Sequence, residues 1–150
     1  MNHKPLQALS IKPMRLYDMM FIRRIDQTNE SQWPLRYYIK SLSSPHFYPY
    51  VARLGDTCVG SMMFRLIMPV MHIDKILIDK SYRRRGIGGK LFEKSIGIAK
   101  KKGALQAFLA VSVSNKYAVN FYSKYGFRIE SIQRNYYATN DDGLKMVRFL

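Results

Sequence analysis

An apolar run that leads into a glycine-rich basic turn is the feature that most constrains the fold. Residues 76–79 read Ile-Leu-Ile-Asp, and the arginines at 83–85 precede a segment with three glycines. Glycine lets the backbone approach a ligand closely. The first N–H groups of a helix, with the helix dipole behind them, attract anions, and arginine adds charge-assisted contacts. We therefore predict a strand, a turn and a helix that together bind a pyrophosphate. The turn residues are Arg83, Arg84, Arg85, Gly86, Ile87, Gly88, Gly89 and Lys90.

The spacing within this turn excludes two common phosphate-binding loops. A Walker loop needs a glycine where Arg84 stands and a serine or threonine where Leu91 stands. A dinucleotide-binding fingerprint needs its third glycine at Leu91. The remaining pattern is Arg-x-x-Gly-x-Gly, directly after an apolar strand.

The rest of the chain alternates between strand-like and helix-like periods. Pro34 suits the first turn of a helix, Gly55-Asp56 suits a hairpin, and Gly103 and Gly126 suit helix ends. The predicted strands are 6–12, 47–54, 57–68, 70–79, 105–113, 127–137 and 144–150, and the predicted helices are 14–28, 33–43, 88–102 and 115–125. This order, β-α-α-β-β-β-α-β-α-β-β, predicts an α/β (or α+β) fold with a mixed sheet. We expect one domain over residues 1–150.

Composition limits the partners and the compartment. Twenty-five Lys and Arg against ten Asp and Glu give a net charge of +15. Such a charge disfavours polyamine and aminoglycoside substrates and favours phosphate-rich cofactors, ribosomes and RNA. The single cysteine, Cys58, excludes an internal disulfide and a cysteine-built zinc site. The first ten residues lack the apolar region of a signal peptide, and Arg65 and Pro69 interrupt the longest apolar stretch. We expect a cytoplasmic protein without a metal or a membrane partner.

Two motifs together resemble the Gcn5-related N-acetyltransferase (GNAT) superfamily. The first is Arg83-x-x-Gly86-x-Gly88, and the second is Asn115-x-x-Ala118-x-x-Phe121-Tyr122-x-x-x-Gly126-Phe127. The resemblance covers essentially the whole chain and implies acetyl-coenzyme A as co-substrate. It implies coenzyme contacts from Asn115 and Tyr122, in addition to the glycine turn. It also implies that a backbone N–H near Ile76, Leu77 or Ile78 polarises the thioester carbonyl.

Within that superfamily the chain looks most like N-terminal acetyltransferases of the ribosomal-protein alanine and N-terminal methionine types. Asn135-Tyr136-Tyr137 resembles their Asn-Tyr-Tyr, and residues 33–37 resemble their Phe-Pro-x-x-Tyr, with Trp for Phe. The implied acceptor is a protein or peptide N-terminus. The implied acceptor groove is lined by Trp33, Pro34, Leu35, Tyr37, Tyr136 and Tyr137.

The resemblance implies a catalytic acid in this chain, but it leaves the catalytic base without a match. Tyr122 matches the tyrosine that protonates the leaving thiolate. The base position of the look-alikes, a glutamate or a histidine, is Ala110 in this chain. We therefore predict His72 as the base acting through water, with Asp74 in reserve. On an ideal strand His72, Asp74 and Ile76 share one face.

A weak base still suits an α-amine. Neutralising a lysine ε-amine at pH 7 costs about 4–5 kcal/mol, whereas an α-amine costs about 1 kcal/mol. Two other functions stay open: acetylation of another amine, such as the aminoacyl group of a charged tRNA, and a non-catalytic coenzyme-binding or RNA-binding module.

Overall fold

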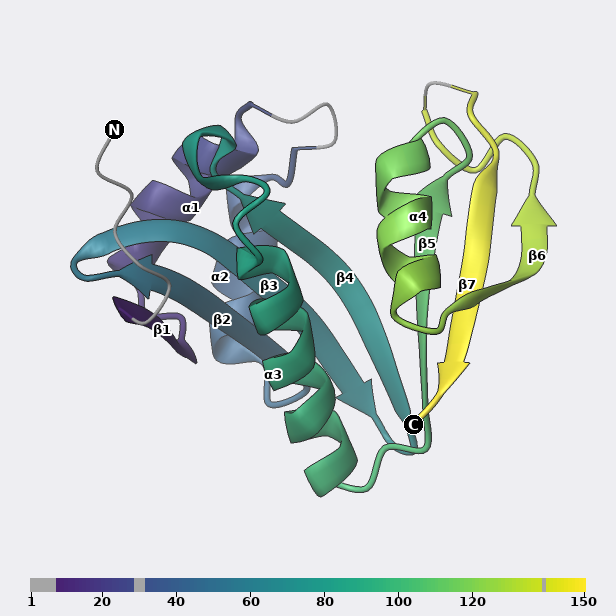
Figure 1. Ribbon diagram of the computed structural model, residues 1–150, viewed down its shortest axis with the longest axis horizontal. Coiled ribbons are helices and arrows are strands. Elements are labelled where there is room, and N and C mark those ends of the chain that lie inside the picture. Colours follow the sequence, from purple (N-terminus) through teal and green to yellow (C-terminus); the bar gives the residue numbers. More distant parts are fainter. Residues whose placement is uncertain (1–7, 29–31, 139) are drawn as a thin grey trace. The chain divides into compact units, whose positions relative to one another are not determined.

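The structure is a computed structural model that describes residues 8–28, 32–138 and 140–150 (Figure 1). The strands are β1 (Leu9–Pro13), β2 (Phe47–Leu54), β3 (Thr57–Ile67), β4 (Val70–Ile78), β5 (Gln106–Ser112), β6 (Arg128–Gln133) and β7 (Gly143–Phe149). The helices are α1 (Asp18–Asp26), α2 (Leu35–Ser43), α3 (Ile87–Lys101) and α4 (Lys116–Lys124), with a short 3₁₀ turn, η2 (Lys80–Tyr82). The predicted order of elements is therefore confirmed.

The strands of the described residues form one mixed sheet in the order β1-β2-β3-β4-β5-β7-β6. β4 and β5 pair in parallel over Val70–Ile73 and Gln106–Leu109. The pairs β1–β2, β2–β3, β5–β7 and β6–β7 are antiparallel. The predicted mixed sheet is thus confirmed. The chain divides into two compact units, residues 1–65 with 75–98, and residues 66–74 with 99–150.

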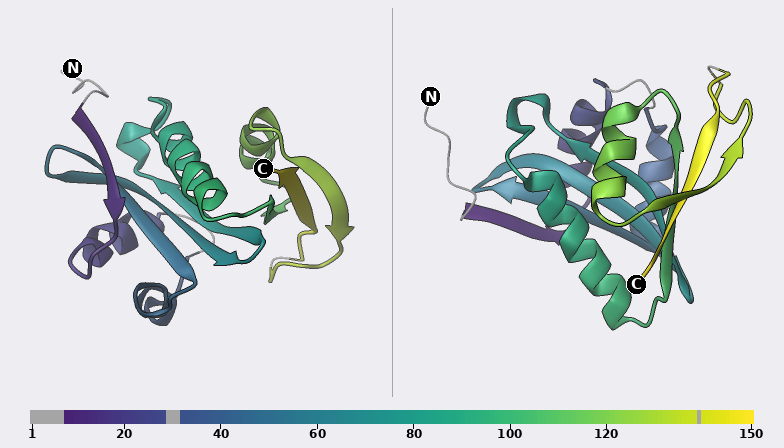
Figure 2. Two further views of the ribbon diagram at one scale, coloured as in Figure 1. Left: turned by 90° about the horizontal axis from the view of Figure 1, so that it is seen from below. Right: turned by 45° about the vertical axis from the view of Figure 1, so that its right-hand side comes forward.

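In the first unit, helices cover both faces of the strands. α1 and α2 lie on one face and α3 on the other (Figure 2, left). The core under α1 and α2 is apolar because these helices place their apolar residues on one stripe. It consists of Met14, Met19, Ile22, Ile25, Tyr38, Val51, Met63 and Leu77.

Helix α3 buries the face that its sequence predicts. The residues at helical spacing along one face of α3 are buried: Leu91, Phe92, Ser95, Ile96 and Ala99. The helix is followed by Gly103, whose φ of +97° favours glycine over residues with a side chain.

In the second unit, β5 alternates between a buried and a more open face. Ala107, Leu109 and Val111 are buried, whereas Ala110 is exposed. Helix α4 follows and ends before Gly126, whose φ is +87°. β6 and β7 close the unit as an antiparallel hairpin.

Several element ends differ from the predicted ones for local reasons. α1 begins at Asp18 rather than at 14, because the Met14 N–H continues the β1 edge by donating to the Pro49 carbonyl (2.8 Å). β6 ends at Gln133 rather than at 137, because Asn135 turns the chain with a φ of +52°. Positions 6 and 7 of the first predicted strand lie outside the described residues.

None of the helices in the described ranges is both long enough and apolar enough to span a bilayer.

Candidate functional site

The glycine turn folds against the end of β4 through its own polar side chains. The Asp79 carboxylate accepts the Ser81 N–H at 2.8 Å and starts η2. The Arg83 Nε donates to the Ile78 carbonyl at 3.2 Å, and the Arg85 guanidinium donates to the Ser81 carbonyl at 3.1 Å. Positive φ angles at Arg84 (60°) and Gly86 (80°) then direct the chain into α3. The turn is therefore held in place by its own hydrogen bonds.

The first turn of α3 has the properties of an anion site. The Lys90 N–H donates to the Gly86 carbonyl at 3.1 Å. The amides of residues 87–89 precede this bond, and such amides have no acceptor within a helix. The first turn carries no acidic residue. Arg83, Arg84 and Lys90 are exposed, while Ile87 is buried and holds the turn on the core. This cationic, accessible helix start fits a pyrophosphate.

The end of β4 lies directly behind this turn. Leu77 is buried in the core, and Ile76 and Ile78 are half-buried. Gly60 of β3 approaches so closely that a Cβ there would lie 2.7 Å from the Leu77 carbonyl oxygen. The position of the Leu77 backbone therefore depends on the missing side chain at residue 60.

In the second motif, residues 115–127, the asparagine caps a helix and the first tyrosine after it on the buried side is Tyr122. The Asn115 side-chain oxygen accepts the Ala118 N–H at 3.1 Å, so Asn115 is the N-cap of α4. It stands before the helix, and not on a helical face with Tyr122 as a seven-residue spacing suggests. Tyr122 is 6% exposed and packs against Phe121 and Phe127, with ring centroids at 5.3 and 5.8 Å. Burial raises its pKa, so its hydroxyl stays protonated at neutral pH.

The predicted acceptor residues of the first unit surround the start of α2. Pro34 is the extended N-cap residue, and Leu35 begins the helix. Leu35 and Tyr37 are exposed, whereas Trp33 is half-buried with its ring edge-on to Tyr37 at 6.0 Å. Part of this group is therefore available to a ligand.

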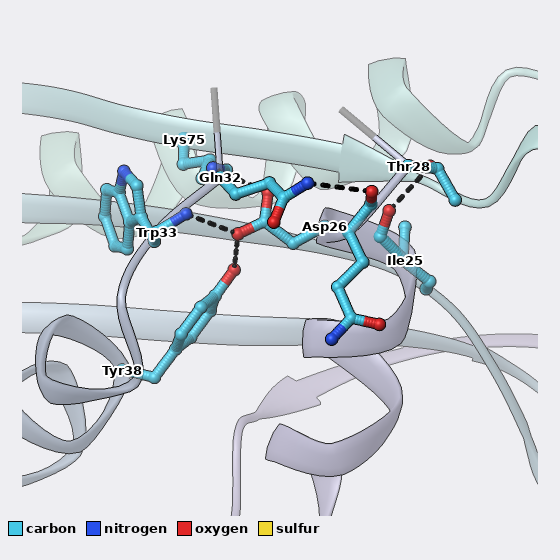
Figure 3. A network of polar contacts seen from close by, with 8 residues as sticks. Ile25, Asp26, Thr28, Gln32, Trp33, Tyr38 and Lys75 are labelled. Carbon is cyan, nitrogen blue, oxygen red and sulfur yellow. Dashed lines mark hydrogen bonds and ion pairs between the residues drawn. The ribbon is translucent and has the colours of Figure 1, made fainter. Parts of the chain in front are cut away.

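The sequence interpretation missed a polar cluster beneath Trp33. Figure 3 shows the Asp26 carboxylate in contact with Trp33, Tyr38 and Lys75. A signal for it exists in the sequence, since an acid on the apolar stripe of α1 and a lysine inside an apolar strand are both unusual in a core. Neither position belongs to a motif.

The predicted acceptor residues of the second unit lie on the connection between β6 and β7. Tyr136 packs on the backbone of Gly143, where an added Cβ would lie 2.8 Å from the tyrosine ring. Its ring meets Tyr137 edge-on at 4.9 Å. Asp141 accepts hydrogen bonds from the hydroxyls of Ser112 (3.1 Å) and Ser114 (2.8 Å). This carboxylate ties the tyrosine connection to the turn before α4.

The candidate base lies on an aromatic surface. His72 packs against the Phe108 ring, with centroids 4.1 Å apart. Ala110 is exposed and pairs with Lys145 on β7. The Lys145 ammonium lies 4.7 Å from the Phe108 ring centroid and 3.2 Å from the Glu130 carboxylate. Lys145, and not a carboxylate, is therefore the cross-strand partner of Ala110, the position at which the resemblance implies a base.

The predicted residues fall into both units. The glycine turn, residues 76–78 and the Trp33 group belong to the first, and His72, Asn115, Tyr122, Tyr136 and Tyr137 belong to the second. Asp74, the reserve base, is half-buried in the second. Within the described ranges, no three His, Cys, Asp or Glu side chains form a group that could hold a metal ion.

Comparisons with known proteins agree on one family. The family model described as "Acetyltransferase (GNAT) family" matches residues 15–127. A Bacillus subtilis protein provisionally named a ribosomal protein bS18-alanine N-acetyltransferase is 29% identical over 140 residues, covering 91% of this chain and 93% of its own. An N-alpha-acetyltransferase of Sulfurisphaera tokodaii is 29% identical over 150 residues, covering 91% and 90%.

A solved structure with the same fold contains a bisubstrate analogue. Arabidopsis thaliana Naa50, in complex with the bisubstrate analogue CoA-Ac-MVNAL, has a TM-score of 0.81 at 22% identity, covering 94% of this chain and 98% of that one. The family match and the two relatives thus indicate an acetyl-coenzyme A-dependent N-acetyltransferase. The chain belongs to the GNAT acetyltransferase family.

We expect Gly88→Glu to abolish coenzyme binding, because a carboxylate would then stand among the first-turn amides and repel the diphosphate. Like charges in contact cost several kcal/mol, so calorimetry with acetyl-coenzyme A should show a loss of affinity of at least about 100-fold. Gly97→Glu is the matched control, since a Cβ at this α3 position meets nothing within 4 Å. Equal affinities of the two variants would contradict the assignment of the turn.

We expect Gly60→Ala to disturb the end of β4, because the new Cβ cannot fit against the Leu77 carbonyl without a backbone shift. Overpacking of this kind costs about 1–3 kcal/mol of unfolding free energy. The KM for acetyl-coenzyme A should rise as well, because residues 76–78 move. Urea unfolding and steady-state kinetics measure the two effects, with Gly97→Ala as control. A variant with unchanged stability and KM would show that β4 accommodates the methyl group.

Proposed function

We propose that this enzyme acetylates the N-terminal α-amine of a protein, with a ribosomal protein as a candidate acceptor. The observation that carries this is the accessible, acid-free first turn of α3 among exposed arginines, which suits the diphosphate of the co-substrate. Support for the acceptor class comes from the two relatives at 29% identity, which are named a ribosomal protein bS18-alanine N-acetyltransferase and an N-alpha-acetyltransferase. The exposed Leu35 and Tyr37 supply apolar surface for a first residue.

In the proposed reaction, the chain's residues hold the partners and move two protons. Acetyl-coenzyme A supplies an acyl group activated as a thioester. The C–N bond forms as the neutral amine attacks, and the C–S bond breaks. A backbone N–H of residues 76–78 donates to the carbonyl oxygen as charge develops there. The proton lost by the amine passes to water or to His72, and the Tyr122 hydroxyl donates a proton to the leaving thiolate.

An α-amine acceptor is consistent with an alanine, and not a carboxylate, at position 110. An α-amine loses its proton near neutral pH, whereas a lysine side chain needs about 4–5 kcal/mol to do so at pH 7. A histidine that acts through water is sufficient for the first and poor for the second. We therefore keep His72 as the proposed base and Asp74 as its reserve.

We expect His72→Ala to lower kcat/KM by about tenfold at pH 7 and by less at pH 9, because the acceptor amine is already neutral in alkaline solution. The measurement is a pH profile of thiol release with a fixed peptide. His46→Ala, at an exposed position, is the control. An equal loss at every pH would indicate that His72 only packs against Phe108.

We expect Tyr122→Phe to slow acetyl transfer by about 100-fold, because the thiolate then leaves without its proton donor. Acetyl-coenzyme A affinity should stay within about twofold, since the ring remains in place. Tyr125→Phe, in the half-buried residue that follows α4, is the matched control. An unchanged rate in Tyr122→Phe would remove Tyr122 from the acid role.

The function itself is tested by turnover on three kinds of acceptor. Thiol release should be fastest with peptides that have a free N-terminus, and absent when that terminus is blocked but a lysine is present. Turnover only with charged tRNA would favour the alternative amine. Binding of acetyl-coenzyme A without turnover on any acceptor would favour a non-catalytic module.

We also propose that residues 1–150 act as one acetyltransferase domain in the cytoplasm, close to the ribosome or another RNA. The net charge is +15, and lysines 100–102 at the C-terminal end of α3 are exposed. Both features suit a polyanionic partner. Binding to ribosomes that weakens steeply with salt would support the RNA contact. Binding that does not change with salt would contradict it.

A further inference from the structure

We propose that Asp26, Lys75 and Tyr38 form a buried positioning cluster that fixes Trp33 as the wall of the acceptor groove and sets the preference for the acceptor's first residue. The inference rests on the proposed function and adds three residues that no motif contains. All of them belong to the first unit.

The Asp26 carboxylate is the centre of the cluster. It stands at the last residue of α1 and is 2% exposed. Its Oδ2 accepts the Tyr38 hydroxyl at 2.5 Å and the Trp33 backbone N–H at 2.9 Å. Its Oδ1 lies 2.7 Å from the Lys75 ammonium (Figure 3). One carboxylate therefore connects the end of α1, the chain before α2, the α2 helix and β4.

The cluster is costly to bury, which argues for a role beyond stability. The Lys75 side chain is only 10% exposed, and burial lowers its pKa while the Asp26 charge opposes this shift. Apolar residues of similar volume often stabilise a core as well as or better than a buried ion pair. A buried pair that fixes one geometry gives specificity in return. Here that geometry is the position of Trp33.

Trp33 is held on several sides while part of it remains open. Its backbone N–H donates a hydrogen bond to the Asp26 carboxylate. The Lys75 ammonium lies 5.3 Å from the indole ring centroid, which is a cation–π distance. The fully buried Tyr38 packs against the indole at 5.7 Å. A small polar hollow is lined by Arg23, Asp26, Gln27, Gln32 and Trp33. The half-buried indole is thus held by its neighbours while part of it stays exposed.

Lys75 connects this wall to the reaction chemistry. It directly precedes residues 76–78, the β4 segment proposed to polarise the thioester carbonyl. A change at Asp26 therefore moves the acceptor wall relative to that segment without touching the glycine turn.

The test uses the fact that Trp33 is the single tryptophan of the chain. Asp26→Asn keeps the shape of the side chain and removes its charge. We expect the peptide KM to rise about tenfold, equivalent to about 1.4 kcal/mol, with kcat and acetyl-coenzyme A affinity within about twofold. The preference among peptides that differ only in their first residue should weaken. The emission spectrum of Trp33 should shift, and its change on peptide binding should shrink.

A second variant and a matched control keep the test decisive. Lys75→Met with Asp26→Asn removes both charges and protects folding if the single variant is unstable. It should show the same kinetic pattern. The control is Asp18→Asn, which breaks the pair between buried Asp18 and Arg53 at the other end of α1. We expect it to lower the melting temperature and to leave the peptide KM unchanged.

The outcomes separate this inference from the proposed function. Unchanged peptide KM, first-residue preference and Trp33 emission in both cluster variants would overturn the inference alone, provided that the unaltered enzyme acetylates N-terminal peptides. Equal effects of Asp26→Asn and Asp18→Asn would also overturn it, because they would indicate a general loss of packing. If the unaltered enzyme acetylates no N-terminal peptide, the proposed function fails, and the inference fails with it.

Discussion

Strand β4 contributes residues to both compact units, so its side chains must pack in two different cores. Its residues 70–74 belong to the unit of β5, with which they pair in parallel, whereas residues 75–78 belong to the unit of α3. The strand therefore carries His72 in one unit and Lys75 in the other. Its end leads directly into the glycine turn. Within the first unit, the absence of a side chain at Gly60 leaves room for the Leu77 backbone at this end of β4.

Charge acts in this protein at two levels that follow different physics. The exposed arginines at the turn act in water, where they attract an anionic ligand and are screened by salt. The buried Asp26–Lys75 pair is shielded from solvent, so its strength depends on geometry. The first kind of charge is suited to binding a phosphate-bearing co-substrate. The second is suited to holding an aromatic side chain in one place.

Hydrophobic periodicity and glycine positions predicted the order of elements and the mixed sheet, because both determine the local conformation of the backbone. The buried face of α3 and the glycine-assisted ends at Gly103 and Gly126 followed from the same local rules. The ends of α1 and β6 did not, because the Met14 amide finds its partner in Pro49, which is distant in sequence. The predicted helix included Asn115, which instead caps α4, although asparagine directly before a helix is a common N-cap residue.

By itself the sequence predicted an anion site: three arginines and three glycines follow an apolar strand, and the structure has a helix without acidic residues in its first turn beginning among these glycines. Only the tertiary structure decided which residues distant in sequence meet. Asp26, Tyr38 and Lys75 come from three separate elements, and their meeting depends on how α1, α2 and β4 pack. The same holds for Lys145, which lies across from Ala110 because of strand register. Local patterns fix local conformation, whereas contacts between distant residues depend on the whole arrangement of the core.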